Sequence, residues 1–362
     1  MADANALTLR VGDKLYGGWK GGTIEQGIDQ ISGGFQLDVI DRWSGQTERW
    51  PICPGDACVL AIGADVVVTG AVDTVSIDLG SRQHTVSVVG RDRTGDLVDC
   101  AAVHKPDQWS LPLERIAEIL AKPFGVKVSA DVATGERFSD FKLQQGETPF
   151  AAIDRMCRMR GVLPISDCKG GLIVTRAGSA PTATALVEGE NILSASGEFS
   201  WSQRFSKTIV KGQSGGAGVS DDEAAAAVRA EATDRAITRY RPTMVIAEGN
   251  LTAATAKTRA EWEVAVAAGK GTKVVVKVQG WRQADGALWP INALVPLKSE
   301  TLGIDDILLI SRVRRSLGTG GSITELTLTR PDAYRGLAIL PKSKSGKATG
   351  LPPGTETFTG KS

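Results

Sequence analysis

The feature that most constrains the fold is a change in the spacing of apolar residues near residue 110. Before that point, Val75, Ile77 and Leu79 alternate with polar residues. An alternation of period two predicts a strand with one buried face and one face in water. After residue 110 the apolar spacing is that of a helix, so the chain changes from pure β to mixed structure.

The first hundred residues predict short strands throughout. The alternation returns at Thr85–Val88 after a turn at Gly80–Ser81, and two more strands are expected near 59–62 and 66–69. Short strands at regular spacing, separated by glycine turns, are typical of a barrel or a sandwich.

The next segment predicts two helices followed by a hairpin. Ser110 is expected to cap the first helix, with Pro112 in its first turn and a stop at Pro123. The second helix is expected to start at Thr148–Pro149 and to end at Gly161. Strands are expected at 162–165 and 172–176.

The remainder predicts a return to strands, interrupted by alanine-rich helices. A capping box at Ser220–Glu223 predicts one helix directly after it, and a second helix is expected over 252–268. Residues 178–185 resemble a linker. Strands are expected at 207–211, 273–279, 292–297, 307–313 and 324–329.

These patterns predict a predominantly β protein of the α+β class with three domains. The expected domains are 1–100, 101–180 and 181–340. The segment 341–362 holds mostly Lys, Ser, Gly, Pro and Thr, so it is expected to be a flexible tail.

Composition excludes several classes of protein. A net charge of +1 gives no global attraction to nucleic acid or to an anionic membrane. Five scattered cysteines do not form a disulfide framework, which favours assembly in the cytosol with reduced, mostly buried thiols. Neither a signal peptide at Met1–Asn5 nor an apolar stretch long enough for a membrane span is recognised.

Catalytic and metal-binding patterns are weak. Of the two histidines, His84 is interpreted as a turn residue, and His104 lies beside no nucleophile motif. No G-x-S-x-G motif occurs. Cys53 and Cys58 lack a second cysteine pair or a nearby histidine, so they are interpreted as core residues instead of zinc ligands.

Cofactor and acid-pair patterns are equally weak. The glycine-rich loop 212–218 is followed by Asp221–Glu223, whose carboxylates would repel a phosphate. The Gly269–Thr272 segment lies between a helix and a strand, the reverse of the P-loop order. Asp305 and Asp306 are adjacent in the sequence, and on an extended strand adjacent side chains point to opposite faces. We therefore expect no cofactor, no metal and no catalytic residue.

Clustered arginines are the remaining candidates for a functional surface. Arginine suits wet interfaces between subunits, and the alternative is a solvated strand end. No aromatic residues are interleaved with these charges, which disfavours nucleic-acid binding. The candidate interface residues are Arg91, Arg93, Arg312, Arg314 and Arg315.

Several segments together resemble the Mu-type phage baseplate hub family, which is related to the late-control D proteins and to the N-terminal part of type VI secretion spike proteins. The resemblance covers about residues 7–335. It rests on LTLRVGDKLYGGWKGGTIEQGIDQISGGFQLDV, on PGDACVLAIGADVVVTGAVDTV with HTVSVVGRDRTGDLVDCAA, on GETPFAAIDRMCRMRGVLPISDCKGGLIVTRAG, on FSWSQRFSKTIVKGQ and on GWRQADGALWPINALVPLKSETLGIDDILLISRVR.

This resemblance implies a homotrimeric, non-enzymatic hub in the virion baseplate. Each chain would contribute two barrels similar to tail-tube protein, so three chains would form a ring that matches a sixfold tube and a threefold spike. The implied partners are the central spike, the tail tube or tape-measure end, and the baseplate wedge proteins. Comparison of the two halves of the sequence, residue by residue, does not reveal the internal repeat that the resemblance implies.

Two other functions remain open at this point. A peptidoglycan-hydrolysing tail component would need convergent acids in a cleft. A carbohydrate-binding tail component would need exposed aromatic residues. The candidate platforms are Trp109, Trp201, Trp262, Trp281 and Trp289, of which Trp281 and Trp289 are expected in the core.

Overall fold

The computed structural model describes residues 4–40, 51–79, 84–178, 180–213, 227–250 and 252–336. The expected tail 341–362 and the capping box Ser220–Glu223 lie outside these residues. The fold is predominantly β with few helices, as the sequence predicts.

The first segment consists of strands, as its alternation predicts. A short helix, α1 (Gly95–Asp99), follows the last of them. The strands are β1 Leu7–Val11, β2 Lys14–Tyr16, β3 Gly21–Gly27, β4 Gly34–Ile40, β5 Ala57–Ile62, β6 Asp65–Leu79 and β7 His84–Asp92.

The middle segment contains the two expected helices, α2 (Leu113–Ala121) and α3 (Pro149–Arg160). Thr148 caps α3 by accepting a hydrogen bond from the Ala151 N–H, as predicted. The predicted cap of α2 is wrong. Ser110 Oγ donates to the Phe138 carbonyl, and the helix begins only after Pro112. The remaining elements are the 3-10 turn Lys122–Phe124, β8 Gln108–Trp109, β9 Lys127–Ala130, β10 Phe141–Lys142, β11 Leu163–Ser166 and β12 Gly171–Thr175.

The last segment contains one of its two predicted helices, α4 (Ala253–Lys270). The alanine-rich stretch 227–233 is a strand, because it pairs along its whole length with β16. The other elements are β13 Ala180–Pro181, β14 Leu186–Val187, β15 Ile192–Phe199, β16 Lys207–Gln213, β17 Ala227–Thr233, β18 Pro242–Asn250, β19 Thr272–Gln279, β20 Ala293–Ser299, β21 Ile304–Gly318, β22 Gly321–Thr329 and the 3-10 turn Pro331–Tyr334.

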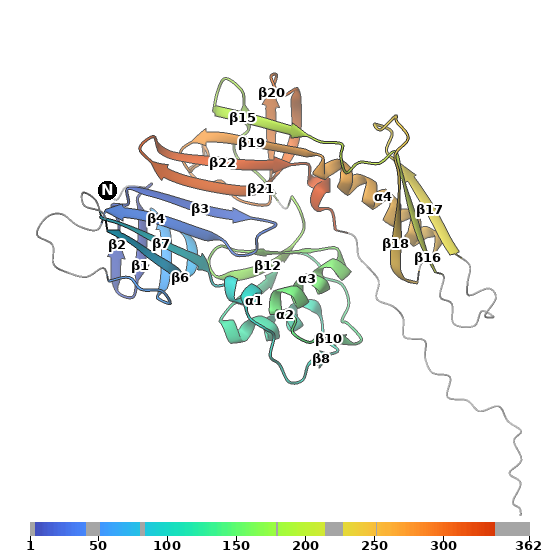
Figure 1. The fold of residues 1–362 in the computed structure, drawn as a ribbon, viewed down its shortest axis with the longest axis horizontal. Coiled ribbons are helices and arrows are strands. Elements are labelled where there is room, and N and C mark those ends of the chain that lie inside the picture. The colour runs from blue at the N-terminus through green and yellow to red at the C-terminus, as the bar shows by residue number, and fades with distance from the viewer. Residues whose placement is uncertain are drawn as a thin grey trace, which may run out of the picture.

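One large sheet connects the two ends of the chain. Its strands run in the order β15-β19-β22-β21-β3-β4-β7-β6-β5-β1-β2; in addition, β20 pairs with β21, and β13 and β14 pair with β20. In Figure 1 the strands lie in layers from β15 to β6, with α1–α3 below and α4 with β16–β18 at one side. Among the described residues this path does not close into a barrel.

The sheet consists of two units with the same topology. The N-terminal strand unit (β3–β7) has the order β3-β4-β7-β6-β5, and the C-terminal strand unit (β15 and β19–β22) has the order β15-β19-β22-β21-β20. Both units use these strands in the same chain order, and every neighbouring pair is antiparallel. The chain therefore contains an internal structural repeat.

The repeat holds at the level of single residues. The pair Ala71–Arg91 corresponds to Leu309–Thr329, and Leu79–His84 corresponds to Leu317–Ser322, a shift of 238 residues in each case. Each long strand also has a bulge at the same place, between Val72 and Thr74 in β6 and between Ile310 and Arg312 in β21. β-Bulges are conserved features of related sheets, so a bulge at the same place in both strands supports the repeat.

The units differ in their flanking elements. The strand beside β5 is the antiparallel β1, whereas the strands beside β20 are the parallel β13 and β14. Between β3 and β4 only a short connection intervenes. The corresponding connection from β15 to β19 carries β16–β18 and α4, whose interface is a small core around Val210, Ala256 and Ala260.

One predicted buried face is exposed. The alternation over 74–79 predicts that Ile77 and Leu79 are buried, but their exposed fractions are 56% and 76%. Across the same hairpin, Val86 and Val88 are fully buried, as predicted. The described part of the chain contains nothing that covers the end of β6.

Candidate functional site

Three of the five predicted interface arginines share one face of the sheet. Arg314 lies opposite Glu25, Glu25 opposite Gly34, and Gly34 opposite Arg91, in one row across four strands. Residues directly opposite in a sheet point to the same face. Arg312, two residues from Arg314, points the same way, and the face is the one opposite the apolar core.

Acidic neighbours surround this row. The Arg312 guanidinium lies 3.0 Å from Glu25, and Arg91 lies 2.6 Å from Asp73 and 2.7 Å from Asp99. Hydrogen bonds to the carboxylates of Asp99 and Asp73 raise the pKa of Arg91. Exposed pairs of this kind contribute little stability, of order 0–1 kcal/mol. Arg91, Arg312 and Arg314 therefore lie on a surface that carries both positive and negative charges.

Arg93 and Arg315 lie elsewhere. Arg93 donates from Nη1 to the Gly125 carbonyl at 3.1 Å, which joins the end of β7 to the middle segment 101–180 with α2, α3 and β8–β12, here called the helical module. Arg315 is only 3% exposed, so its side chain contacts this chain and is not available to a neighbour. The alternation of β21 indicates that Arg315 differs from Arg312 and Arg314, because Arg315 lies on the same face of the strand as the buried Val313.

The Arg315 side chain bridges the two strand units. Nη1 donates to Gln26 Oε1 of β3 at 2.8 Å, and Nη2 donates to the Trp289 carbonyl. Gln26 in turn donates to the Val67 carbonyl at 3.0 Å. Burial lowers the pKa of Arg315 to about 10, because a charged guanidinium loses its hydration inside the protein.

Asp92 forms a second buried junction, between the N-terminal strand unit and the helical module. Its carboxylate accepts from the Gly33 and Thr94 N–H groups at 2.9 Å and from Ser166 Oγ at 2.7 Å. Burial raises the pKa of Asp92, while these hydrogen bonds act in the opposite direction. No sequence motif indicates this role.

The two long edges of the sheet are the most unusual surface feature. β15 pairs only with β19, and residues 74–79 of β6 pair only with β7, among the residues that the structure describes. Large apolar side chains project from both edges. On β6 these are Ile77 and Leu79, and on and beside β15 they are Leu193, Phe199 and Trp201, each at least half exposed. An unpaired apolar edge is a template for another strand.

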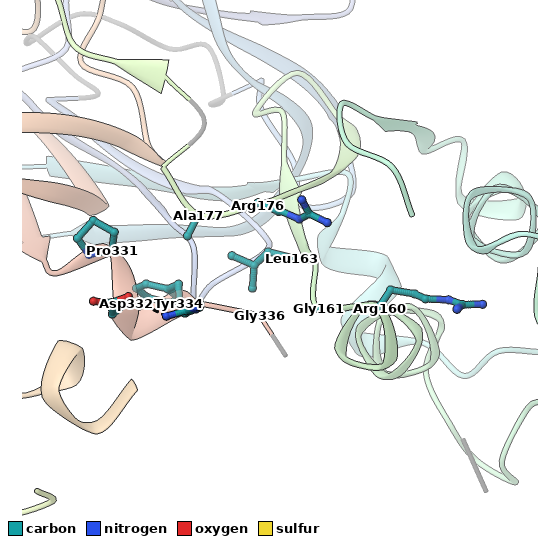
Figure 2. Close-up of a pocket in the computed structure, with 10 residues that line it drawn as sticks. Arg160, Gly161, Leu163, Arg176, Ala177, Pro331, Asp332, Tyr334 and Gly336 are labelled. Carbon is teal, nitrogen blue, oxygen red and sulfur yellow. Dashed lines mark ion pairs between the residues drawn. The ribbon is translucent and has the colours of Figure 1, made fainter. Parts of the chain in front are cut away.

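A cleft of about 450 Å³ lies between the helical module and the last turn of the described chain. Figure 2 shows Arg176, Leu163 and Tyr334 around it, while Arg160 points away. The Arg160 guanidinium instead lies over the Phe138 ring, 4.4 Å from its centroid. Asp332 is the single carboxylate among the lining residues, so the pair of acids that glycoside hydrolysis needs is not assembled here.

Among the remaining candidates that the structure describes, His104 and Asp306 have polar partners and Cys58 is buried. His104 Nε2 lies 3.0 Å from the Ile119 carbonyl, and Asp306 pairs with Arg330 at 3.3 Å. Burial raises the pKa of Cys58 to about 12, while Cys53 is exposed, so the expectation of a core position is right for Cys58 alone. No cluster of three metal-binding side chains occurs in the described residues. The side chain of His84 and the residues Asp221–Glu223 lie outside the description.

Three of the five candidate platform tryptophans are buried. Trp281 and Trp289 are each 2% exposed, as predicted for core residues, and Trp109 is also buried. The indole N–H of Trp262 donates to the Arg335 carbonyl. Trp201 is half exposed, with the Arg204 guanidinium 5.3 Å from its ring centroid. In addition, no helix within the described ranges has the length and hydropathy of a membrane span.

Four family profiles match consecutive parts of the chain. Residues 6–92 match the Mu phage baseplate assembly protein GpP-like N-terminal domain, and residues 94–176 match the second domain of baseplate hub protein gp44-like proteins. Residues 204–262 match the third domain of tail protein NMB1110-like proteins, and residues 252–336 match the fourth domain of GpP.

Whole-chain comparisons agree with these matches. The chain is 36% identical over 319 residues to the baseplate hub protein gp44 of Escherichia phage Mu, covering 86% of this chain and 83% of that protein. The crystal structure of a 43 kDa tail protein of prophage MuSo2 from Shewanella oneidensis is 36% identical, with a TM-score of 0.83 over 91% of this chain and 99% of that one. A tail protein of Neisseria meningitidis shares the fold at 23% identity, with a TM-score of 0.76 over 91% and 98% of the two chains.

Proposed function

The chain belongs to the Mu-type phage baseplate hub family, and from this premise we propose that it is the structural hub of a contractile tail. Three copies form a ring that adapts the sixfold tail tube to the threefold central spike. The hub has no catalytic residue and no cofactor, and it acts by holding its partners in register.

The internal repeat is the observation that supports this proposal most directly. A chain with two strand units of the same topology presents two similar surfaces, so three chains present six. Identical chains that associate head to tail form a closed ring when the rotation between neighbours closes. The proposal assigns the two units to the two tube-like barrels of the family, each completed by strands of neighbouring chains.

We assign four parts of the chain to this architecture. Residues 1–100 and 181–340 carry the tube-like units, 101–180 form the module between them, and 341–362 are the fourth part, which lies outside the described residues. Arg91, Arg93, Arg312 and Arg314 contact neighbouring subunits or the other baseplate proteins, where arginine forms ion pairs and tolerates water.

The partners follow from the place of a hub in the tail. They are the central spike on one side, the tail tube or tape-measure end on the other, and the wedge proteins around the ring. The protein is assembled in the cytoplasm of the host bacterium and becomes part of the virion baseplate.

The solution mass tests this proposal. Light scattering on the purified protein is expected to give three times the chain mass of 38.1 kDa. Negative-stain images should show a ring with six similar lobes. A stable monomer at high concentration would contradict the hub assignment, and turnover of peptidoglycan or binding on a glycan array would favour a hydrolytic or carbohydrate-binding tail component.

A further inference from the structure

The contact between the two strand units inside one chain defines a strand pairing that can be repeated between chains. In that contact β21 runs antiparallel to β3, with Val313 opposite Gln26, Arg315 opposite Ile24 and Leu317 opposite Gly22. By the internal repeat, β21 corresponds to β6 and β3 corresponds to β15. In the described part of the large sheet, β15 and residues 74–79 of β6 both have an unpaired edge.

We infer that residues 75–79 of β6 in one chain pair antiparallel with residues 195–199 of β15 in a second copy of the chain. This inference rests on the proposed ring and specifies the junction that closes it. The open edge of β6 is thus covered by β15 of an identical chain, and the open edge of β15 by β6 of an identical chain.

The repeat also fixes the register. Arg314 corresponds to Ser76, because both lie three residues beyond the bulged position of their strand. Glu25 lies opposite Gly34 of β4, which lies opposite Arg91 of β7. Glu198 lies opposite Lys273 of β19, which lies opposite Thr329 of β22. Because Arg91 and Thr329 are equivalent in the repeat, Glu25 corresponds to Glu198. Since Arg314 lies opposite Glu25, Ser76 is placed opposite Glu198 of the second copy.

The sequence fits this register on both faces. One face brings Val75 opposite Phe199, Ile77 opposite Gly197 and Leu79 opposite Ala195. The other face brings polar residues together, Ser76 with Glu198 and Asp78 with Ser196, and no two like charges face each other. A shift by one residue would place apolar side chains against polar ones, which sheets disfavour.

Gly197 leaves room for the Phe199 ring of its own chain. A Cβ atom at Gly197 would lie 2.8 Å from the Phe199 ring, so the ring covers the glycine. An aromatic side chain over a glycine on an edge strand is a recognised way to stabilise such an edge. In the proposed register Ile77 of the first chain lies beside the Phe199 ring of the second copy, and the unpaired edges of both strands become paired.

The arrangement also explains why the period-two pattern of 74–79 has no buried face within one chain. The face of Val75, Ile77 and Leu79 corresponds to that of Val313, Arg315 and Leu317, which is inside the sheet junction of the same chain. The pattern is therefore that of a strand whose partner is on another chain.

Disulfide trapping tests the register in the full chain. The double variant Ser76→Cys with Glu198→Cys is oxidised mildly, and the products are separated without reductant. Both positions are exposed, so the substitutions should leave the fold intact. We expect at least tenfold more covalent dimer and trimer from the double variant than from either single variant. The single variants measure the background cross-linking through the exposed Cys53 and Cys100.

The matched control moves one cysteine along the same face. Ser76→Cys with Ser194→Cys places the two sulfur atoms about 13 Å apart along the strand, too far for a disulfide. If the protein is a trimer but the two double variants cross-link equally, or neither cross-links, the β6–β15 junction is wrong and the proposed hub function still stands. A protein that stays monomeric in light scattering would overturn both.

Discussion

Arg315 and Gln26 lie on neighbouring strands of different strand units, and their side chains share a buried hydrogen bond of 2.8 Å. Both residues are almost inaccessible to water. The pair lies within the β21–β3 pairing, which joins the two units in the described part of the chain, so it fixes one unit against the other. A buried arginine whose partners are an amide oxygen and a carbonyl is sensitive to any change at this junction.

Replacing Arg315 by Ala is therefore expected to lower the free energy of unfolding by about 3 kcal/mol. The substitution leaves Gln26 Oε1 and the Trp289 carbonyl without their donor and creates a cavity. Urea unfolding followed by tryptophan fluorescence measures the change. Arg314→Ala is the matched control, because that side chain is exposed on the same strand, and it should alter stability by less than about 0.5 kcal/mol. Equal effects in both variants would contradict a bridging role for Arg315.

Asp92→Asn is expected to destabilise the protein by about 1–3 kcal/mol although it preserves the shape of the side chain. Two backbone N–H groups and a serine hydroxyl donate to this carboxylate, and an amide NH2 group cannot accept from them. Thermal unfolding compares the variant with Asp96→Asn, a nearby acid whose side chain is exposed. No loss of melting temperature in Asp92→Asn would show that the junction does not depend on the charge.

The ion pair of Glu147 with Arg155 is expected to make stability depend on pH below neutrality. Burial alone raises the pKa of Glu147, but hydrogen bonds from Arg155 and from the Gln144 N–H outweigh it and hold the pKa below its usual value. A carboxyl whose pKa is lower in the folded state stabilises the fold at pH values above its unfolded pKa. That contribution is lost as the pH falls through the folded pKa, which lies below 4.5.

Unfolding in urea at pH 7 and at pH 3.5 should therefore show a smaller pH dependence for Glu147→Gln than for the unaltered chain. Glu118→Gln is the control, because the Glu118 carboxylate forms an exposed pair with Arg115 and is not buried. If the two variants show the same pH dependence, the Glu147 pair is not the cause.

Replacing Leu79 by Lys is expected to weaken self-association at least tenfold without lowering the melting temperature of the single chain. The side chain is 76% exposed, so a lysine is tolerated in the monomer but would have to be buried in the proposed strand junction. Sedimentation velocity over a range of concentrations measures the assembly. Val103→Lys is the control, since Val103 is 88% exposed but lies in the helical module, away from both sheet edges. Equal association of the two variants would contradict the use of this edge.

Local signals in the sequence predicted many elements correctly. The cap at Thr148 and the helix stop at Gly161 were confirmed, because both depend on residues within one turn. The predicted cap at Ser110 was wrong because its hydroxyl has a partner 28 residues away, the Phe138 carbonyl. Similarly, the alanine-rich stretch 227–233 favours a helix by propensity, but pairing with β16 makes it a strand. Tertiary partners override propensity in such cases.

The functional surfaces were only partly predictable. Alternation places Arg312 and Arg314 on one face and Arg315 on the other, but which face is buried depends on β3, nearly three hundred residues earlier in the chain. The hydrogen bonds of Asp92 come from three separate segments and have no sequence signature. The repeat of the two strand units was not visible in the letters because it is preserved in pairing and bulges instead of side-chain identity.

The unequal connections of the two strand units have a consequence for a ring of such chains. The β3–β4 connection is a tight loop, whereas the equivalent β15–β19 connection carries a helix and three strands. Every second lobe around the circumference would therefore bear an appendage. An inner wall with six equivalent positions could then coexist with an outer surface that repeats only three times, and duplication followed by a single insertion is enough to produce that difference.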